Sequence, residues 1–226
     1  MIRVYVLCEG QTEESFVKKL LCDMFFSKGI ALIPIICETK RERSGLKHKG
    51  GVSTYGKIRK ELVALCKSHP SEYVTMMFDY YALPHDTPSF DNMPAGSAYD
   101  KVAYLENAIF QDIDTSNFLP NIILYEFEGL LFSSPDAFSY CGLPESAVVE
   151  LRNVRDFFVT PESINDGVDT APSKRIMSIH PSYNKLVDGV NIARSIGIDK
   201  IMSECVHFCS WIERIAKLSN GWRAKS

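Results

Sequence analysis

Acidic residues accompany three apolar stretches of the chain, and their types and positions suggest metal chemistry. Glu9 comes directly after IRVYVLC, Asp79 ends the stretch YVTMMFD, and Glu126 and Glu128 lie within NIILYEFEGLLF. Carboxylates gathered at one place repel one another unless a cation lies among them, and hard oxygen ligands suit Mg²⁺ or Mn²⁺. We therefore expect a site for one of these cations, with Glu9 as a ligand or as the general acid or base.

Each of these acids also has a simpler interpretation as a solvated loop residue. Glu126 and Glu128 leave two alternatives open: a continuous strand would place both on one face, whereas a helix starting between them would direct only one into the site. Glu14 is expected to be a helix-dipole charge in the first turn of the next helix, and Glu13 is undecided between that role and a ligand.

The residues after Glu9 could receive a phosphate. Gly10 permits a close backbone approach, and a helix that starts near Gln11 and Thr12 would direct its amide groups toward the same edge. A metal beside a phosphate-attracting helix end is typical of a phosphoryl-transfer site.

These residues need a scaffold that brings distant strand ends together, and the apolar patterning predicts one. Strands alternate with helices over the first 132 residues, which predicts a parallel sheet in an α/β fold, with ligands at the carboxyl ends of its strands. Pro34 favours an edge position or a bulge for the second strand. The expected strands are 2–8, 30–37, 73–81 and 121–132, the last running into a helix, and the expected helices are 11–28, 53–67 and 99–113.

Beyond residue 135 the pattern loosens into short helices, expected near 145–156, 184–196 and 203–218. We expect residues 1–135 to form an α/β core and residues 136–226 to pack on it as a helical appendage, within one compact unit.

Five motifs carry a resemblance to a known family. EGQTEESF, FDYYALP, YEFEGLLF, PSKRI and CVHFCSW together resemble a bacterial family of uncharacterised Toprim-like proteins, distantly related to the nuclease domain of OLD-type endonucleases and to RloB-like proteins. The resemblance implies a Rossmann-like Toprim fold, Mg²⁺-dependent cleavage of a nucleic acid, and an AAA or ABC-type ATPase partner in phage defence.

The resemblance also implies roles for single residues. An acid after the first Toprim strand acts in acid/base chemistry, and a DxD pair after the third holds Mg²⁺. Glu9 matches the first position and Asp79 the first Asp of the pair, but Tyr81 stands at the second. Glu126 or Glu128 is the candidate for the missing ligand.

Cations that could contact the substrate lie in two segments. The segment 40–60 is basic, and its Lys47, Lys49 and Lys57 are candidates for phosphate contact, with a solvated surface as the alternative. The second segment comprises PSKRI (172–176) and PSYNK (181–185). Its Lys174 or Lys185 could neutralise charge on the phosphate, and Ser173 and Arg175 at a helix start could bind the phosphate.

His207, within CVHFC, could donate a proton or bind phosphate, although a structural histidine is the alternative. Cys205, His207 and Cys209 have poor spacing for zinc, since position 207 points away from the helix face that 205 and 209 share. No Walker A, GxGxxG or GxSxG motif is present, so the motifs give no sign of ATP hydrolysis, dinucleotide binding or serine hydrolysis.

Composition places few limits on function. The net charge is −3, so overall charge does not indicate nucleic-acid binding, and the seven irregularly spaced cysteines predict reduced thiols. No apolar run is long enough to span a membrane and charge comes too early for a signal peptide, so we expect a cytoplasmic protein.

The sequence thus favours a Mg²⁺-dependent nuclease that cleaves DNA or RNA as the effector of an ATPase-linked defence system. The first alternative is a non-catalytic, Toprim-derived subunit that binds nucleic acid or a partner. The second is a phosphatase or nucleotide phosphotransferase on a similar sheet.

Overall fold

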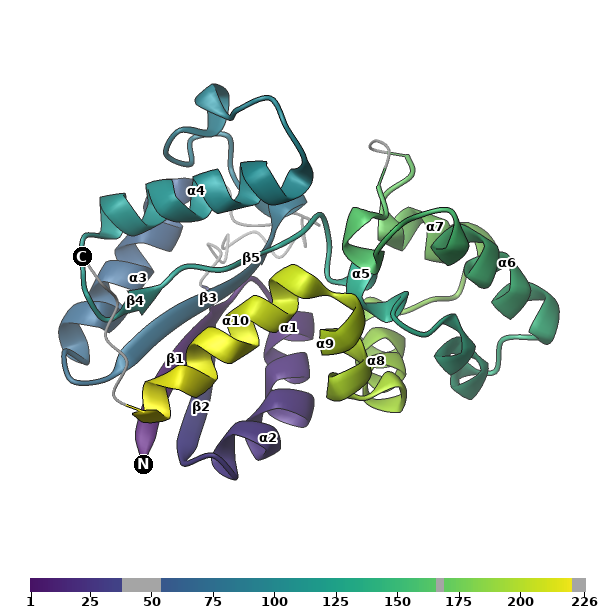
Figure 1. Cartoon of the computed structure of the whole chain (residues 1–226), viewed down its shortest axis with the longest axis horizontal. Coiled ribbons are helices and arrows are strands. Elements are labelled where there is room, and N and C mark those ends of the chain that lie inside the picture. Colours follow the sequence, from purple (N-terminus) through teal and green to yellow (C-terminus); the bar gives the residue numbers. More distant parts are fainter. Residues whose placement is uncertain (38–53, 166–168, 221–226) are drawn as a thin grey trace, which may run out of the picture.

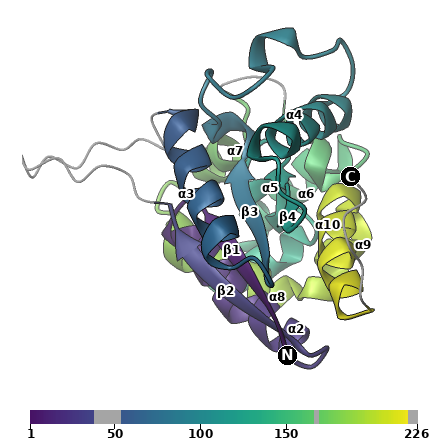
Figure 2. The same ribbon diagram turned by 90° about the vertical axis from the view of Figure 1, so that its left-hand side faces the viewer.

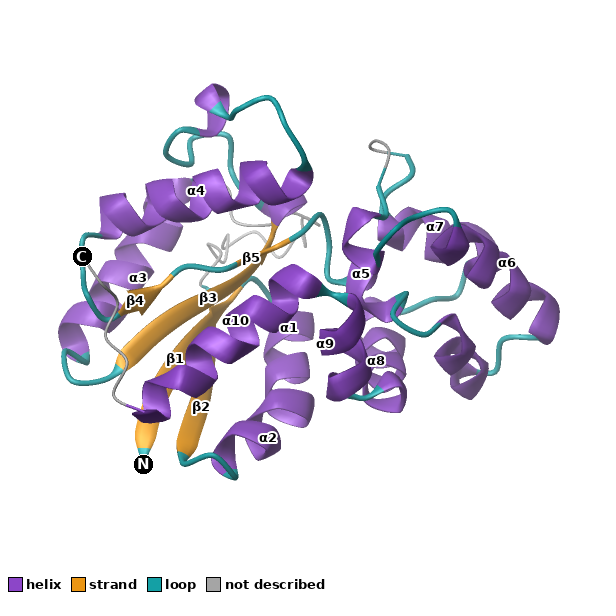
Figure 3. Ribbon diagram, in the orientation of Figure 1, coloured by secondary structure: helices purple, strands orange, loops and turns teal. Residues whose placement is uncertain are grey.

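A parallel sheet forms the centre of the molecule (Figures 1 and 3). The structure, a computed structural model, describes residues 1–37, 54–165 and 169–220. Within these residues the strand order is β2-β1-β3-β4, β5 also pairs with β3, and every pairing is parallel. The strands are β1 (Ile2–Cys8), β2 (Ile30–Ile36), β3 (Tyr73–Asp79), β4 (Phe118–Leu119) and β5 (Ile122–Ile123). The α/β fold predicted from the alternation is confirmed.

Helices cover both faces of this sheet, and Figure 2 shows α3 and α10 on opposite sides of it. The core around Tyr5, Leu7 and Phe78 is filled from α3 and α4, whereas the core around Val4 and Val6 is filled from α1, α8 and α10. Successive residues of β1 point to opposite faces, so the part of the strand that is buried on both sides, residues 4–8, is apolar. The helices are α1 (Gln11–Phe16), α2 (Cys22–Phe26), α3 (Tyr55–Ser68), α4 (Ala98–Ile113), α5 (Glu128–Leu131), α6 (Glu145–Asp156), α7 (Pro172–Ile179), α8 (Val190–Ile196), α9 (Ile198–Glu204) and α10 (Val206–Lys217).

Most of the predicted elements are present with small shifts of their ends. The helix expected at 11–28 is one helical run in which a π-helical segment joins α1 to α2, and Gly29 follows it with a left-handed φ of 75°. β2 lies at the edge of the sheet, which is one of the two alternatives that Pro34 left open. The helix expected at 184–196 is divided into a π-helical turn and α8, whereas the one expected at 203–218 is present as α10, with α9 as a separate short helix before it.

The strand predicted over residues 121–132 is wrong in extent. Only Phe118–Leu119 and Ile122–Ile123 pair with β3, and the interruption between them contains Pro120, which has no amide hydrogen to donate. Asn121 donates from its side chain to the carbonyl of Met76 instead, at 3.2 Å. Beyond residue 123 the apolar residues are buried without forming a strand, because the chain turns at Tyr125, whose φ is 57°.

Residues 136–226 were expected to form a helical appendage. Their described part carries α6 to α10, and Figure 1 shows α6 and α7 projecting to one side of the sheet while α10 lies across it. Trp211 of α10 is fully buried and donates through Nε1 to Oγ1 of Thr75 in β3, at 2.9 Å. The last long helix is therefore part of the core. Among the described residues no helix has the length and apolar character needed to cross a membrane, and all seven cysteines are free.

Candidate active site

The ammonium group of Lys185 lies among three buried carboxylates. Its Nζ is 3.1 Å from Oδ2 of Asp79, 3.3 Å from Oε2 of Glu128 and 3.5 Å from Oε1 of Glu13. The carboxylates come from the end of β3, the start of α5 and the first turn of α1, so three separate elements meet at the carboxyl edge of the sheet. We call Glu9, Glu13, Asp79 and Glu128 the acidic cluster.

Asp79 holds this cluster together. By the alternation along β3 it lies on the same face as Thr75 and Met77, which is the face covered by α1 and α10. Its Oδ1 accepts a hydrogen bond from the backbone N–H of Phe127 at 2.9 Å, and its own N–H donates to Oε2 of Glu9 at 3.2 Å. One residue thus links the end of β1 to the segment that leads into α5.

Glu13 belongs to the site, and it was left undecided by the sequence. In α1, Glu13 shares a face with the buried Phe16 and Val17, whereas Glu14 forms an exposed ion pair with Lys18 at 2.7 Å. The i+3 and i+4 spacing to two apolar residues is the signal that separates the two glutamates. Gly10 adds room, because a Cβ there would lie 3.4 Å from Oε2 of Glu13.

Glu126 and Glu128 have different roles, because a helix starts between them. Glu128 is the first residue of α5 and faces Lys185. Glu126 accepts a hydrogen bond from the backbone N–H of Ser173 at 2.9 Å, at the start of α7. Of the two alternatives, the helix start is therefore correct, and Glu126 binds the helix end that was expected to receive phosphate.

Lys185 is positioned by a short π-helical turn, Lys185–Gly189. The side chain of Asn184 caps this turn by accepting from the amides of Leu186 and Val187, at 3.1 and 3.2 Å. Tyr183, just before it, donates its hydroxyl to Oε1 of Glu128 at 3.5 Å. Tyr183 is a contact that strand-end reasoning missed, since it lies in a loop more than fifty positions along the chain from its partner.

The electrostatics of the cluster follow from burial and from an excess of negative charge. Burial, with the neighbouring Glu13, raises the pKa of Glu9 to about 7, although Lys185 and the Asp79 amide oppose the rise. Burial also raises the pKa of Asp79 and of Glu128 against the effect of Lys185. For Lys185, burial would lower the pKa, but the surrounding carboxylates outweigh it and raise the pKa well above its usual value.

The donor chemistry of the cluster fits a hard divalent cation, but the observed arrangement is centred on an ammonium group. Oε1 of Glu13 and Oε2 of Glu128 are buried oxygens without a hydrogen-bond partner, which is the kind of ligand atom Mg²⁺ or Mn²⁺ takes. Nevertheless, no three His, Cys, Asp or Glu side chains in the described residues are placed to hold one metal ion.

The remaining candidates lie outside the acidic cluster or at its margin. Gln11 is exposed at the start of α1 and Thr12 beside it is buried, while Lys174 is exposed on α7. Arg175 donates to the carbonyl of Thr170 at 2.7 Å and stacks on Phe158. Lys57 lies on α3, which covers the opposite face from α1. Lys47 and Lys49 fall outside the described residues.

His207 has a structural environment. Its Nε2 is 3.0 Å from Oε1 of Glu106 in α4. Its backbone N–H donates to Oε2 of Glu162, and the backbone N–H of Phe208 donates to Oε1 of the same residue. Burial opposes protonation, but Glu106 outweighs it and raises the pKa of His207. These contacts join α4 to the start of α10 and do not involve the acidic cluster.

Tyr81, at the second position of the DxD pattern, joins an aromatic group instead of supplying a ligand. Its ring lies 5.4 Å from that of Tyr125 and 6.0 Å from that of Tyr80. The backbone N–H of Tyr81 donates to the carbonyl of Tyr125 at 3.1 Å. This contact holds the segment after β3 beside the turn that leads to Glu126.

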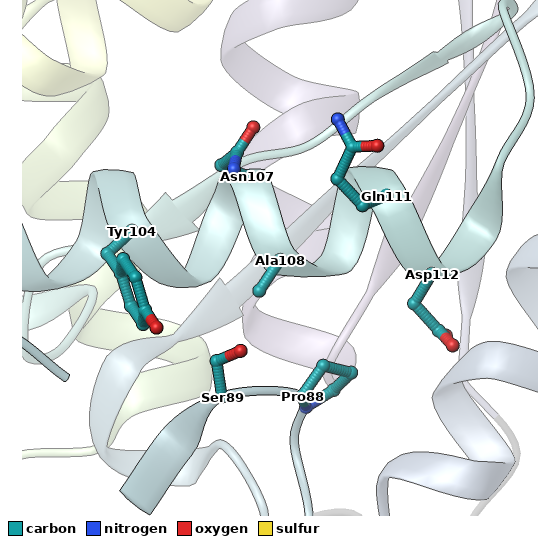
Figure 4. Close-up of a pocket in the computed structure, with 7 residues that line it drawn as sticks. All are labelled: Pro88, Ser89, Tyr104, Asn107, Ala108, Gln111 and Asp112. Atoms are coloured by element: carbon teal, nitrogen blue, oxygen red, sulfur yellow. The ribbon is translucent and has the colours of Figure 1, made fainter. Parts of the chain in front are cut away.

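A surface hollow of about 430 Å³ between α4 and the loop after β3 is a separate feature (Figure 4). Its charged side chain, Asp112, is engaged by the Tyr55 hydroxyl and the Arg59 guanidinium, both at 2.8 Å. Because its one charged side chain is already paired, the hollow is a weaker candidate site than the acidic cluster.

The fold and the cluster define an α/β protein with a carboxylate-rich site at the carboxyl edge of a parallel sheet. The chain belongs to the DUF4276 family, described as a domain of unknown function, whose model matches residues 8–216. The match begins at the last residue of β1, covers the other strands and the acidic cluster, and ends within α10. No significant match was found among curated proteins or among solved structures.

Proposed function

We propose that this chain is a divalent-metal-dependent nuclease of Toprim type, which hydrolyses phosphodiester bonds of DNA or RNA at the acidic cluster. The observation that carries the proposal is the convergence of Glu13, Asp79 and Glu128 around Lys185, with Glu9 bonded to the Asp79 amide. Carboxylates and one cation at the carboxyl edge of a parallel sheet suit phosphoryl-transfer chemistry.

The chain's own residues can divide the work of hydrolysis. Glu9, whose pKa is raised to about 7, is suited to take a proton from the attacking water near neutral pH. Lys185 supplies positive charge to offset that developing on the phosphate oxygens. Asp79, Glu128 and Glu13 would hold a divalent cation once their oxygens close in from the positions that they take around Lys185, and this cation would supply Lewis-acid stabilisation and a more acidic water.

The resemblance to Toprim-like defence proteins supports a nucleic acid as substrate and an ATPase as partner. We extend the proposal accordingly: the chain acts in the cytoplasm as the effector of such a pair, and its activity depends on the ATPase.

The test is a cleavage assay on plasmid DNA, single-stranded DNA and tRNA, in Mg²⁺, Mn²⁺ or EDTA, with and without a candidate ATPase. We expect metal-dependent cleavage that falls by about 10²–10⁴-fold in Glu9→Gln and Asp79→Asn. Glu14→Gln is the matched control, because Glu14 is a partly exposed acid of the same helix as Glu13 and is paired with Lys18 instead of Lys185. Absence of cleavage under all conditions, or cleavage unchanged in both cluster variants, would contradict the proposal.

One observation favours a second candidate, a non-catalytic subunit that binds nucleic acid. An ammonium fills the centre of the cluster, and no metal-holding group of three ligands is formed by the described residues. This candidate predicts salt-sensitive nucleic-acid binding that is the same in EDTA and in Mg²⁺. Turnover of p-nitrophenyl phosphate without cleavage of a polymer would instead indicate a phosphatase.

A further inference from the structure

The contacts of Lys185 leave the buried acids incompletely satisfied. An ammonium group has three hydrogens to donate, yet among the described residues its one side-chain hydrogen bond is to Oδ2 of Asp79. Oε1 of Glu13 and Oε2 of Glu128 lie at ion-pair distance from the same Nζ without hydrogen-bond geometry. Buried carboxylate oxygens in this condition are costly, so the cluster retains capacity for a further or stronger cation.

The carboxylates are the more deeply buried side chains, and the lysine has the longer and more flexible one. Asp79 is held by the Phe127 amide, Glu128 by the Tyr183 hydroxyl, and the side chains of Glu13, Asp79 and Glu128 are at most 6% exposed. The Lys185 side chain is 37% exposed, and its ammonium is carried on a flexible four-carbon stem. Lys185 can therefore leave toward solvent without disturbing the backbone of β3 or α5.

A divalent cation would satisfy the same oxygens better. Mg²⁺ and Mn²⁺ accept several carboxylate oxygens at once, and a charge of two offsets more of the repulsion among the acids than the single charge of an ammonium group does. An ammonium and a divalent cation both placed among the same buried oxygens would repel each other strongly, because the site is shielded from water. Occupancy by one therefore opposes occupancy by the other.

We propose that Lys185 is an exchangeable internal cation: its ammonium neutralises Glu13, Asp79 and Glu128 in the metal-free protein, and a divalent cation takes its place. Metal binding then frees the ammonium at the mouth of the site, where it is available to a phosphate of the substrate. The inference rests on the proposed metal dependence, and it adds that Lys185 sets the metal affinity and couples metal binding to substrate binding.

The test measures Mn²⁺ binding by isothermal titration calorimetry, which needs no activity. In Lys185→Met we expect Mn²⁺ to bind about tenfold or more tightly than in the unchanged chain, a coupling of ordinary size for competing sites. In EDTA the variant should have a lower Tm, because its buried acids have lost their cation, and Mn²⁺ should raise that Tm more than it raises the Tm of the unchanged chain.

Lys200→Met is the matched control, since Lys200 is a half-exposed lysine in an ion pair with Glu204 on α9. It should leave Mn²⁺ affinity unchanged. If Lys185→Met does not fold in EDTA, Lys185→Gln, which removes the charge and keeps polar atoms, is measured in its place.

The outcomes separate this inference from the proposed function. Tighter Mn²⁺ binding in the Lys185 variants supports the exchange even if no nucleic acid is cleaved. Unchanged or weaker Mn²⁺ binding in these variants, or no Mn²⁺ binding by any of the proteins, overturns the exchange, even if cleavage is observed.

Discussion

A buried carboxylate with few hydrogen bonds is less stable when ionised than when protonated, and the acidic cluster contains several such groups. Lys185 offsets part of this repulsion, but one ammonium serves four acids. At the scale of the residue, the site therefore stores electrostatic free energy that binding a proton or a metal ion can release. This stored energy is the physical basis for expecting both pH dependence and cation binding.

Glu9 gives a prediction about pH. Because its pKa is raised from the ordinary 4.5 to about 7, the folded chain holds a proton that the unfolded chain has lost over this range. The stability contributed by this group is complete at low pH and declines as pH rises through about 7, by roughly 1–3 kcal/mol. Glu9→Gln, which imitates the protonated acid, should remove this decline.

The measurement is Tm from pH 5 to 8.5 in EDTA, with Glu14→Gln as the control. The groups that face Glu9 are Glu13, Glu128 and Lys185, together with the Asp79 amide. A pH profile that is the same for Glu9→Gln and for the unchanged chain would show that another group titrates.

At the scale of the element, two short irregular segments aim the functional side chains. The turn at Tyr125, with its left-handed φ of 57°, ends the strand pairing of β5 and directs Glu126 to α7 and Glu128 to Lys185. The π-helical turn after Tyr183 places Lys185 opposite. A regular strand or α-helix in either place would change which side chains face the site, so irregularity here has a positional role.

Gly189 provides a test of the second segment. Its φ of −56° suits any residue, but a Cβ would come within 2.7 Å of the Tyr183 hydroxyl and 3.3 Å of Cε1 of Phe127. Gly189→Ala should therefore displace Tyr183 from Glu128 and destabilise the chain by about 1–3 kcal/mol, the range found for overpacking. The measurement is the free energy of unfolding in urea.

Gly56→Ala is the matched control, because Gly56 lies within α3 and nothing is found within 4 Å of its added Cβ. Alanine favours a helix interior over glycine, so this change should stabilise the chain by up to about 1 kcal/mol. Equal effects of the two substitutions would argue against close packing at Gly189.

At the scale of the whole molecule, one hydrophobic core includes residues from both sides of position 135, where the α/β core was expected to meet its helical appendage within one compact unit. One hydrophobic cluster contains Val4 and Val6 of β1 together with Phe208, Trp211 and Ile215 of α10. A fragment without α10 would expose one apolar face of the sheet to water. The site depends on the same continuity, because Lys185 comes from the later part of the chain and its acids from the earlier part.

A substitution at Trp211 therefore tests whether the sheet and the later helices unfold together. Trp211→Ala removes the largest fully buried side chain and its hydrogen bond to Thr75, and should lower the free energy of unfolding by about 3–5 kcal/mol. Circular dichroism should record one unfolding transition, shifted as a whole. Phe157→Ala, at an aromatic residue that is 81% exposed, should change stability by less than about 0.5 kcal/mol. Two separated transitions would instead indicate independently folding parts.

The sequence by itself determined the sheet and part of its acidic edge. Largely apolar runs located β1, β2 and β3, since strands within a covered sheet contain few polar residues, and Pro34 was consistent with the edge position of β2. The carboxyl-end rule for parallel sheets then brought Glu9 and Asp79 together, and they are hydrogen-bonded. These features follow from local composition and from the general geometry of sheets.

Only the tertiary structure decided which of Glu13, Glu126 and Glu128 enter the site and which cation lies among them. The turn at Tyr125, which no local pattern predicted, directs Glu126 and Glu128 to different partners. Lys185 hydrogen-bonds to Asp79, which lies 106 positions away in the chain. Periodicity reports which face of an element is buried, but it does not report which distant element covers that face. The centre of this site is formed by such long-range contacts, so folding of the whole chain was needed to place Lys185 among its acids.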